Sequence, residues 1–331
     1  MKEVFGLTGF QWIILIFLIL GILNYLFLVF DTPYENKISG LSEGFESGAQ
    51  TGATESEKSK IAWFENDELF DDFYASVYDN LTQLPSRFPQ EVALTINQWK
   101  KLSSVNTMDV LDCGCGTGIA SVLFAKMGVN SVVGLDKSDS MLRRAKSVTL
   151  PSSGLSLDKR ESVTFLKGDM DQQHTFAGGQ FSHAVLLFFT VYYSNDMSGL
   201  FRNLFHWIRP GGQLGIELVN KYKFDPLLES ASPFLGTTVQ KYSKKRVTKS
   251  KVEFDKFSYE ADFDLQDPNA EFREVFRFPD KSVRRQRHTL HMKDIKDIVH
   301  IAQTAGWVYD GYVDLLSAGF EYAYVLIFTH P

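Results

Sequence analysis

Apolar residues along the chain follow two different periods, and the alternation between them predicts an α/β protein. Short and almost continuously apolar runs lie at 108–112, 131–135, 183–188 and 213–219. Such runs are typical of parallel strands, because helices cover both faces of a parallel sheet. Between the runs, apolar residues recur every three or four positions, which predicts amphipathic helices. This order of elements favours a doubly wound sheet.

The same pattern gives approximate bounds for the helices. We expect helices at 67–81, 91–102, 117–127, 138–146, 200–208 and 292–305. Pro85 and Pro89 are expected to end the first of them, because proline lacks an N–H group and clashes with the preceding turn. Gly128 is a natural C-terminal stop, and Ser138 is a natural N-cap. The polar segment 147–160 is predicted to be a loop.

The first sixty residues differ in composition from the rest of the chain. Residues 10–30 carry no charge, and a helix of 21 residues spans about 30 Å, the hydrocarbon thickness of a bilayer. No small-residue cleavage site follows, so we predict a transmembrane helix after a short tail at 1–9, in preference to a cleaved signal or a buried hairpin. Residues 31–60 are rich in Gly, Ser, Thr and Glu, which predicts a flexible linker.

The most informative stretch combines a strand, a glycine turn, a helix, a second strand and an acid. The turn reads Asp112-Cys113-Gly114-Cys115-Gly116-Thr117-Gly118. Glycines at alternate positions let the backbone approach a ligand where any Cβ would collide. Asp136 ends the next strand, the position from which an acid binds ribose hydroxyls in nucleoside-binding βαβ units. The stretch therefore predicts a nucleoside site.

Three motifs in order resemble the class I S-adenosylmethionine-dependent methyltransferases. The glycines run G-x-G-x-G behind an acid, unlike the dinucleotide pattern G-x-G-x-x-G. Phe-Leu-Lys-Gly-Asp-Met at 165–170 and Ile-Arg-Pro-Gly-Gly-Gln-Leu at 208–214 match two later motifs of that family. The resemblance implies a methyltransferase domain at 106–331, with a seven-stranded sheet of order 3-2-1-4-5-7-6 and an antiparallel last strand. An NAD-binding Rossmann domain is the less favoured alternative.

The resemblance also implies that the cofactor is S-adenosyl-L-methionine and assigns residues to it. Asp112 is expected near the methionine amino group, Asp136 at the ribose and Asp169 at the adenine amino group. Met141 would pack near the adenine, and Tyr78 would close over the cofactor from lid helices at 61–105. The other expected contacts are Cys113, Gly114, Cys115, Gly116, Lys137, Met170 and Leu187.

Candidate catalytic residues follow the fourth strand and end a long insertion at 220–290. Tyr192 and Tyr193 could bind the acceptor or exchange a proton with it. His288 and His291 are candidate bases, because a histidine accepts a proton near neutral pH. For each of these four residues, a structural role is the alternative interpretation. The chain lacks Asn/Asp-Pro-Pro-Tyr after this strand, which disfavours methylation of a nucleobase amine by that route.

Composition and charge narrow the class of partner. The net charge is −6 and the pI is near 5.7, which disfavours general nucleic-acid binding. Six basic residues at 240–251 are a local exception, interpreted as a solvated strand edge or, less favoured, a surface for lipid headgroups or phosphate. Cys113 and Cys115 are too close in sequence for a good disulfide, and no metal-ligand spacing is present.

These observations support two hypotheses of different class. The first is a membrane-anchored methyltransferase with a small-molecule or lipid-like acceptor, and the second is a tethered S-adenosylmethionine-binding module without turnover. Lys2 and Lys37 flank the expected anchor and leave its orientation undecided. Because S-adenosylmethionine is a cytosolic metabolite and free thiols indicate a reducing compartment, we expect the catalytic domain to face the cytosol.

Overall fold

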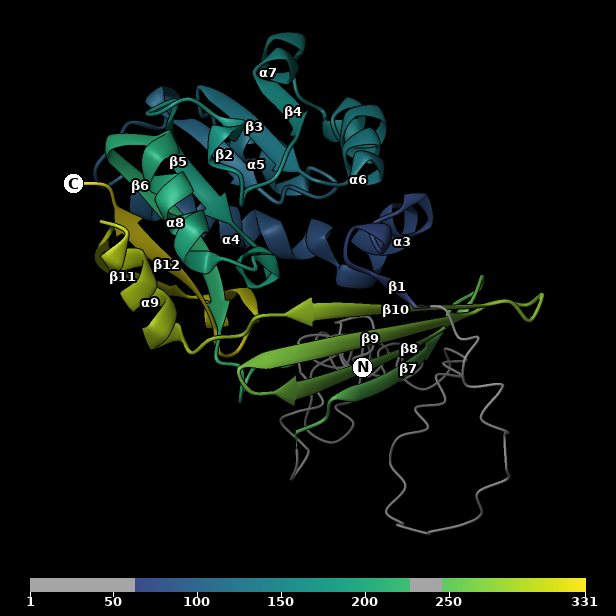
Figure 1. Ribbon diagram of the computed structural model, residues 1–331. Helices are drawn as coiled ribbons and strands as arrows, with labels where there is room; N and C mark the ends of the chain where they lie inside the picture. The colour runs from purple at the N-terminus through teal and green to yellow at the C-terminus, as the bar shows by residue number, and fades with distance from the viewer. Residues whose placement is uncertain (1–62, 227–245) are drawn as a thin grey trace, which may run out of the picture. The chain divides into compact units, whose positions relative to one another are not determined.

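The computed structural model describes residues 63–226 and 246–331, which form two β-sheets with their associated helices (Figure 1). The expected transmembrane helix at 10–30, the linker at 31–60 and the first half of the basic run at 240–251 lie outside the described residues. Within the two described ranges, no helix is both long enough and apolar enough to cross a bilayer.

The larger sheet has seven strands in the order β11-β12-β6-β5-β2-β3-β4. Their bounds are β2 (Asp109–Cys113), β3 (Ser131–Asp136), β4 (Val163–Lys167), β5 (Phe181–Leu186), β6 (Ile208–Val219), β11 (Val308–Asp314) and β12 (Ala323–Thr329). The first five of these along the chain pair in parallel, whereas β12 runs antiparallel to both β6 and β11. Numbered within this sheet, the order is 3-2-1-4-5-7-6, which confirms the predicted topology.

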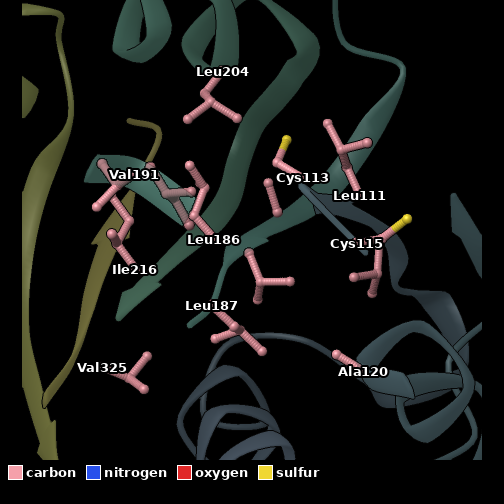
Figure 2. Close-up of a cluster of buried hydrophobic side chains, with 14 of the residues drawn as sticks. Leu111, Cys113, Cys115, Ala120, Leu186, Leu187, Val191, Leu204, Ile216 and Val325 are labelled. Atoms are coloured by element: carbon pink, nitrogen blue, oxygen red, sulfur yellow. The ribbon is translucent and has the colours of Figure 1, made fainter. Parts of the chain in front are cut away.

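Helices cover the two faces of this sheet and exclude water from its centre. They are α4 (Leu84–Trp99), α5 (Ile119–Lys126), α6 (Asp139–Arg144), α7 (Leu157–Glu161), α8 (Met197–Trp207) and α9 (Ile295–Thr304). Leu111, Leu186 and Ile216 come from three adjacent strands and lie in one cluster with Leu204 of α8 (Figure 2). All four side chains are fully buried. Burial on both faces explains why these strands are continuously apolar.

The N-terminal helices begin at residues that the sequence pattern did not identify. The helix predicted at 67–81 begins instead at Asp72 as α3 (Asp72–Thr82), because Asp71 caps it and accepts a 3.0 Å hydrogen bond from the Tyr74 amide. Pro85 does not end a helix but lies in the first turn of α4, where proline leaves no intrahelical bond unmade. The predicted start at 91 was therefore wrong.

The predicted loop at 147–160 was also wrong in part. It holds the end of a π-helical turn (Ala145–Thr149), a 3₁₀ turn (Pro151–Ser153) and the start of α7. These turns are short, and the described side chains of α7 include none that is buried. The apolar periodicity that identifies a packed helix is therefore missing from this segment.

The insertion at 220–290 builds a second sheet that the sequence did not predict. Its antiparallel strands are β7 (Lys249–Glu253), β8 (Ser258–Gln266), β9 (Asn269–Arg277) and β10 (Val283–Leu290), and the short β1 (Phe64–Glu65) pairs in parallel with β10. Tyr259 and Phe276 are buried on the face that packs against Tyr74 of α3. Lys249 and Lys251, from the basic run, form ion pairs with acids of β8, which matches the interpretation as a solvated strand edge.

Two glycines at opposite ends of α5 allow a matched stability test. Both Gly118 and Gly128 have positive φ, at 80° and 93°. A Cβ at Gly118 would lie 2.6 Å from the Phe165 ring, whereas one at Gly128 would meet nothing within 4 Å. Gly128→Ala should cost about 1–2 kcal/mol for the left-handed backbone alone. Gly118→Ala should cost a further amount of about 1–3 kcal/mol for the clash.

The measurement is urea unfolding of both variants, monitored by tryptophan fluorescence. A larger loss of unfolding free energy in Gly118→Ala is the expected result. Equal losses would show that the ring of Phe165 yields without cost, and that the close packing of α5 against β4 is not needed for stability.

Candidate active site

A cavity of about 300 Å³ lies where the strands β2, β3, β4 and β5 end. Chain order reverses between β2 and β5, and ligands of open α/β sheets bind at such a switch point. The second sheet borders the same cavity through β10. The residues around it include Gly114, Gly116, Asp136, Gly168, Asp169, Phe188, Thr190, Tyr193 and His288.

Asp136 at the end of β3 is the best-anchored group of the cavity. Its Oδ2 accepts a hydrogen bond from the Gly116 amide, and its Oδ1 accepts one from the Ser138 amide, both at 2.8 Å. Burial raises the pKa of Asp136, and the hydrogen bonds from these two amides counteract that rise. Each oxygen keeps a lone pair beyond its amide bond, so the carboxyl group can accept hydrogen bonds from a ligand.

The glycine turn after β2 requires residues without a side chain. Gly114 and Gly116 have φ angles of 67° and 53°, which L-residues with a Cβ rarely adopt. A Cβ at Gly114 would also lie 2.5 Å from a side-chain carbon of Thr190. The turn therefore leaves its backbone open to the cavity, as the sequence pattern predicted for a close approach to a ligand.

A second acidic position lies beyond β4. Asp169 accepts a hydrogen bond from the Asp171 amide at 2.9 Å and pairs with the Lys137 ammonium group at 3.1 Å. Burial lowers the pKa of Lys137, but the hydrogen bond and charge of Asp169 outweigh this and raise it. The predicted residues Tyr78, Met141 and Met170 lie in the same cavity wall.

Four of the predicted cofactor contacts do not line the cavity. They are Asp112, Cys113, Cys115 and Leu187, all buried in the core. The Asp112 carboxylate is 2% exposed and accepts a 2.6 Å hydrogen bond from Ser121 of α5. β2 is covered on both faces, so its side chains point into the core while the following backbone meets the cavity.

The structure separates the four candidate catalytic residues into two pairs. Tyr193 and His288 line the cavity, and the Tyr193 hydroxyl lies 2.6 Å from His288 Nδ1. Tyr192 is 1% exposed, and its hydroxyl accepts a hydrogen bond from the Val219 amide at 3.0 Å. His291 lies outside the cavity wall, with its ring nitrogens near Asn195 and Asn269. Tyr192 and His291 therefore do not share the cavity with Tyr193 and His288.

Several residues of the cavity wall were not identified from the sequence. They are Asp67, Leu69, Phe70, Leu135, Ser138, Gly168, Asp171, Phe188, Thr190, Asn195, Arg287 and Thr289. Phe188 and Phe189 have positive φ angles of 46° and 66°, which are rare for bulky residues and often mark functional sites. Glycine or asparagine would have indicated such a turn, but phenylalanine gives no such signal. Ser138 was predicted only as a helix cap.

Comparison with known proteins concerns the part of the chain that contributes most of the cavity wall. Residues 110–212 match the family model described as a methyltransferase domain. These residues form a methyltransferase domain. The chain is also similar in structure to an S-adenosylmethionine-dependent methyltransferase from Clostridium acetobutylicum ATCC 824, with a TM-score of 0.59 and 16% identity. That match covers 78% of this chain and 97% of the other, and it shows a shared fold.

Two curated relatives are similar to the chain in sequence. One is the sterol 24-C-methyltransferase erg6 of Aspergillus fumigatus, 32% identical over 109 residues, which cover 33% of this chain and 27% of the relative. The other is the sterol 24-C-methyltransferase of Debaryomyces hansenii, 27% identical over 173 residues, which cover 50% of this chain and 44% of the relative. The chain therefore spans less than half the length of either relative.

The buried Asp112 should make the stability of the methyltransferase domain depend on pH. Burial raises the pKa of this carboxyl from 3.8 to about 7, and the charge of Asp136 adds to the rise. A carboxyl with a raised pKa in the folded state destabilises the fold as pH rises from the unfolded to the folded value. Between about pH 4 and pH 7, Asp112 should therefore lower the unfolding free energy, by as much as about 4 kcal/mol.

Asp112→Asn should remove this dependence and stabilise the domain at pH 8 relative to the unchanged protein. The measurement is the difference in unfolding free energy between variant and unchanged protein from pH 4 to pH 8. A difference that does not vary with pH would show that Asp112 ionises normally. The affinity of the variant for S-adenosylmethionine should stay within about threefold of that of the unchanged protein, because Asp112 does not line the cavity. A threefold change corresponds to less free energy than a typical hydrogen bond contributes.

Proposed function

We propose that this protein transfers a methyl group from S-adenosyl-L-methionine to a small-molecule or lipid-like acceptor. The observation that carries the proposal is the pairing of the Asp136 carboxylate with a glycine turn in which four amides already have partners within the chain. The amides of Gly114 and Cys115 donate to the Leu135 carbonyl, that of Gly116 to Asp136, and that of Gly118 to the Cys115 carbonyl.

This arrangement fits a nucleoside without a pyrophosphate. Dinucleotide sites use free amides at the start of the helix to bind phosphate oxygens. In this chain the amides of the turn at Gly114, Cys115, Gly116 and Gly118 already have partners, which supports S-adenosylmethionine over NAD. Asp136 would hold the ribose hydroxyls, Asp169 would accept from the adenine amino group, and Met141 would pack on the base.

The chemistry that the cofactor supplies when bound is an electrophilic methyl group on a sulfonium sulfur. The protein's own contribution is to hold the acceptor in line with that methyl group and to exclude water, and such positioning supplies a large part of the acceleration. The cavity wall provides both functions, because its glycine turn admits the donor while its aromatic residues exclude water.

Part of the cavity wall is apolar. Leu69, Phe70 and Phe188 contribute to it. Such a wall favours an acceptor with a hydrocarbon or ring surface, since burial of apolar area drives its binding. Both curated relatives are sterol 24-C-methyltransferases, which supports a lipid-like acceptor for this chain as well.

Replacing Asp136 by Ala should weaken binding of S-adenosylmethionine by about 10- to 100-fold. Two ribose hydroxyls would lose their acceptor, at a cost of about 1–3 kcal/mol. The matched control is Asp139→Asn, three residues further along the chain than Asp136. It removes an exposed carboxylate that pairs with Lys167. Titration calorimetry measures both, and unchanged affinity in Asp136→Ala would refute the assignment of the ribose site.

The same variants separate catalysis from binding without turnover. Membrane-lipid and cytosolic extracts are incubated with S-adenosylmethionine that carries a radioactive methyl group, and transfer to extractable products is counted. We expect transfer with the unchanged protein and with Asp139→Asn, and a loss of transfer with Asp136→Ala at low cofactor concentration. Binding without any transfer would favour the alternative, a tethered S-adenosylmethionine-binding module.

We further propose that residues 10–30 anchor the protein in a membrane and that the domain faces the cytosol. The apolar composition of that segment supports the anchor. Cys113 and Cys115 are both free and buried, which supports a reducing compartment. A cytosolic domain would also have direct access to the cofactor pool.

The chain contains its own reporter of orientation. Asn80-Leu81-Thr82 is an acceptor sequence for glycosylation, and Asn80 is exposed near the end of α3. In a eukaryotic cell, the full chain should show no endoglycosidase-sensitive shift, and sealed microsomes should leave the domain open to protease. A shift that disappears in Asn80→Gln, together with protection from protease, would place the domain in the lumen.

A further inference from the structure

A buried carboxylate of the second sheet stands directly behind His288. Glu274 of β9 is 1% exposed. Its two oxygens accept hydrogen bonds from the hydroxyls of Tyr74 at 2.9 Å and Tyr259 at 2.6 Å, and from the side-chain Nε2 of Gln286 at 2.6 Å. Nε2 of His288 lies 2.6 Å from the same carboxylate. Every one of these partners comes from the insertion or from α3.

The surroundings of Glu274 favour its charged form. Burial by itself raises the pKa of this carboxyl, but the hydrogen bond and charge of His288, with hydrogen bonds from Tyr259 and Gln286, lower it overall. None of the partners named above is a lysine or arginine. The negative charge is therefore held by hydrogen bonds, and it would interact strongly with the imidazolium ring that forms when His288 gains a proton.

The charged carboxylate determines the direction of the next two hydrogen bonds. A carboxylate only accepts, so the proton between it and His288 belongs to Nε2. In neutral His288, Nδ1 then carries a lone pair and accepts from the Tyr193 hydroxyl at 2.6 Å. The oxygen of Tyr193 keeps its own lone pairs for a donor in the cavity, whose wall it shares.

We propose that Tyr193, His288 and Glu274 form a proton relay, and that the acceptor is therefore methylated on a hydroxyl oxygen. This inference rests on the proposed function and names its class of acceptor. Tyr193 is the catalytic residue that touches the acceptor, while His288 receives the proton and Glu274 is a positioning residue behind it.

The relay balances the charges and atoms of methyl transfer. The acceptor oxygen forms a bond to the methyl carbon of a sulfonium donor, and the carbon–sulfur bond breaks with its electron pair left on sulfur. The acceptor proton passes to the Tyr193 oxygen as the Tyr193 proton moves to Nδ1 of His288. The positive charge lost from sulfur thus reappears on His288, next to the Glu274 carboxylate. Tyr193 is neutral again after the transfer, so the loss of the one extra proton from His288 to water, back through the Tyr193 hydroxyl, restores the relay.

Other acceptors would use this relay less well. A neutral amine attacks through its own lone pair before it loses a proton, and the attacking carbon of an alkene need not carry one at all. A hydroxyl group is a poor nucleophile at neutral pH unless a base removes its proton during attack, which contributes about 10²- to 10⁴-fold. Only in the hydroxyl case does the relay act in the bond-forming step.

The first test compares Tyr193→Phe and Glu274→Gln with Tyr259→Phe. Tyr259→Phe removes one donor to Glu274 but leaves the path from Tyr193 to His288 intact. We expect Tyr193→Phe to lower kcat by about a hundredfold or more, with cofactor affinity by calorimetry unchanged. Glu274→Gln should lower kcat, because the positive charge that forms on His288 loses its carboxylate partner, and Tyr259→Phe should lower kcat far less. Equal losses in all three variants would indicate a structural role and overturn the relay.

The second test needs neither acceptor nor cofactor. In the unchanged protein, ¹⁵N NMR should find the Nε2–H form of neutral His288, because Glu274 faces it from β9, with Tyr193 of η6 (Thr190–Tyr193) and Tyr74 of α3 also in contact. Glu274→Gln should remove this preference. The exposed His300 serves as the reference ring. An Nδ1–H form in the unchanged protein would refute the relay, even if a variant in the first test failed to fold.

The third test identifies the acceptor atom. A membrane-lipid extract is incubated with ¹³C-methyl S-adenosylmethionine, and the carbon shift of the product distinguishes an O-methyl from an N-methyl or C-methyl group. An O-methyl product is expected, and an N-methyl or C-methyl product would overturn the inference while leaving the proposed function intact. Failure of the unchanged protein to bind S-adenosylmethionine would instead refute the proposed function itself.

Discussion

The two hydrogen bonds of Asp136 connect the parts of the molecule on which the site depends. One bond holds the glycine turn after β2 through the Gly116 amide, and the other holds the start of α6 through the Ser138 amide. Ser138 in turn donates its hydroxyl to the Phe70 carbonyl at 2.6 Å, which ties the segment before α3 to the same point. The glycine turn, the start of α6 and the segment before α3 therefore depend on one carboxylate, and loss of that group would loosen all three.

The cavity has a floor, formed by the glycine turn after β2 and by the ends of β3 and β4, and a roof, formed by β10 of the second sheet. Different interactions hold the two parts. At the floor, backbone amides of a local βαβ unit satisfy Asp136, and burial still raises its pKa. At the roof, side chains of α3 and of the neighbouring strands β8 and β10 satisfy Glu274 so fully that its pKa falls. Phe70 contacts both regions, because its ring packs edge-on against Tyr193 and His288 at 5.8 and 5.9 Å between centroids.

This difference explains how much of the molecule could be predicted from its sequence. The floor depends on neighbours along the chain, so the glycine spacing and the position of Asp136 were enough to predict a nucleoside site. Together with the motifs at 165–170 and 208–214, they carried the resemblance that implied the strand order and much of the cavity wall. The roof depends on strand pairing within the insertion, where Glu274 and His288 meet across β9 and β10 without any motif. The two adjacent tyrosines could not be told apart, because a 3₁₀ turn alone directs Tyr193 to the cavity and Tyr192 to the core.

The strained backbone at the end of β5 shows how the remaining wall is held. Phe188 lines the cavity at a positive φ angle, and its amide donates to the buried Glu217 of β6. Arg87 of α4 pairs with both Glu217 and Glu91 and lies over the Phe188 ring, 5.2 Å from its centroid.

One guanidinium group cannot balance two buried carboxylates. Burial and the charge of Glu217 accordingly raise the pKa of Glu91 far above its usual value, which favours the neutral form of this carboxyl. The remaining Arg87–Glu217 pair can then keep Phe188 in a conformation that the residue would not adopt alone. Because the floor, the roof and this wall are each held by buried hydrogen bonds, the site needs little reorganisation before it binds a ligand.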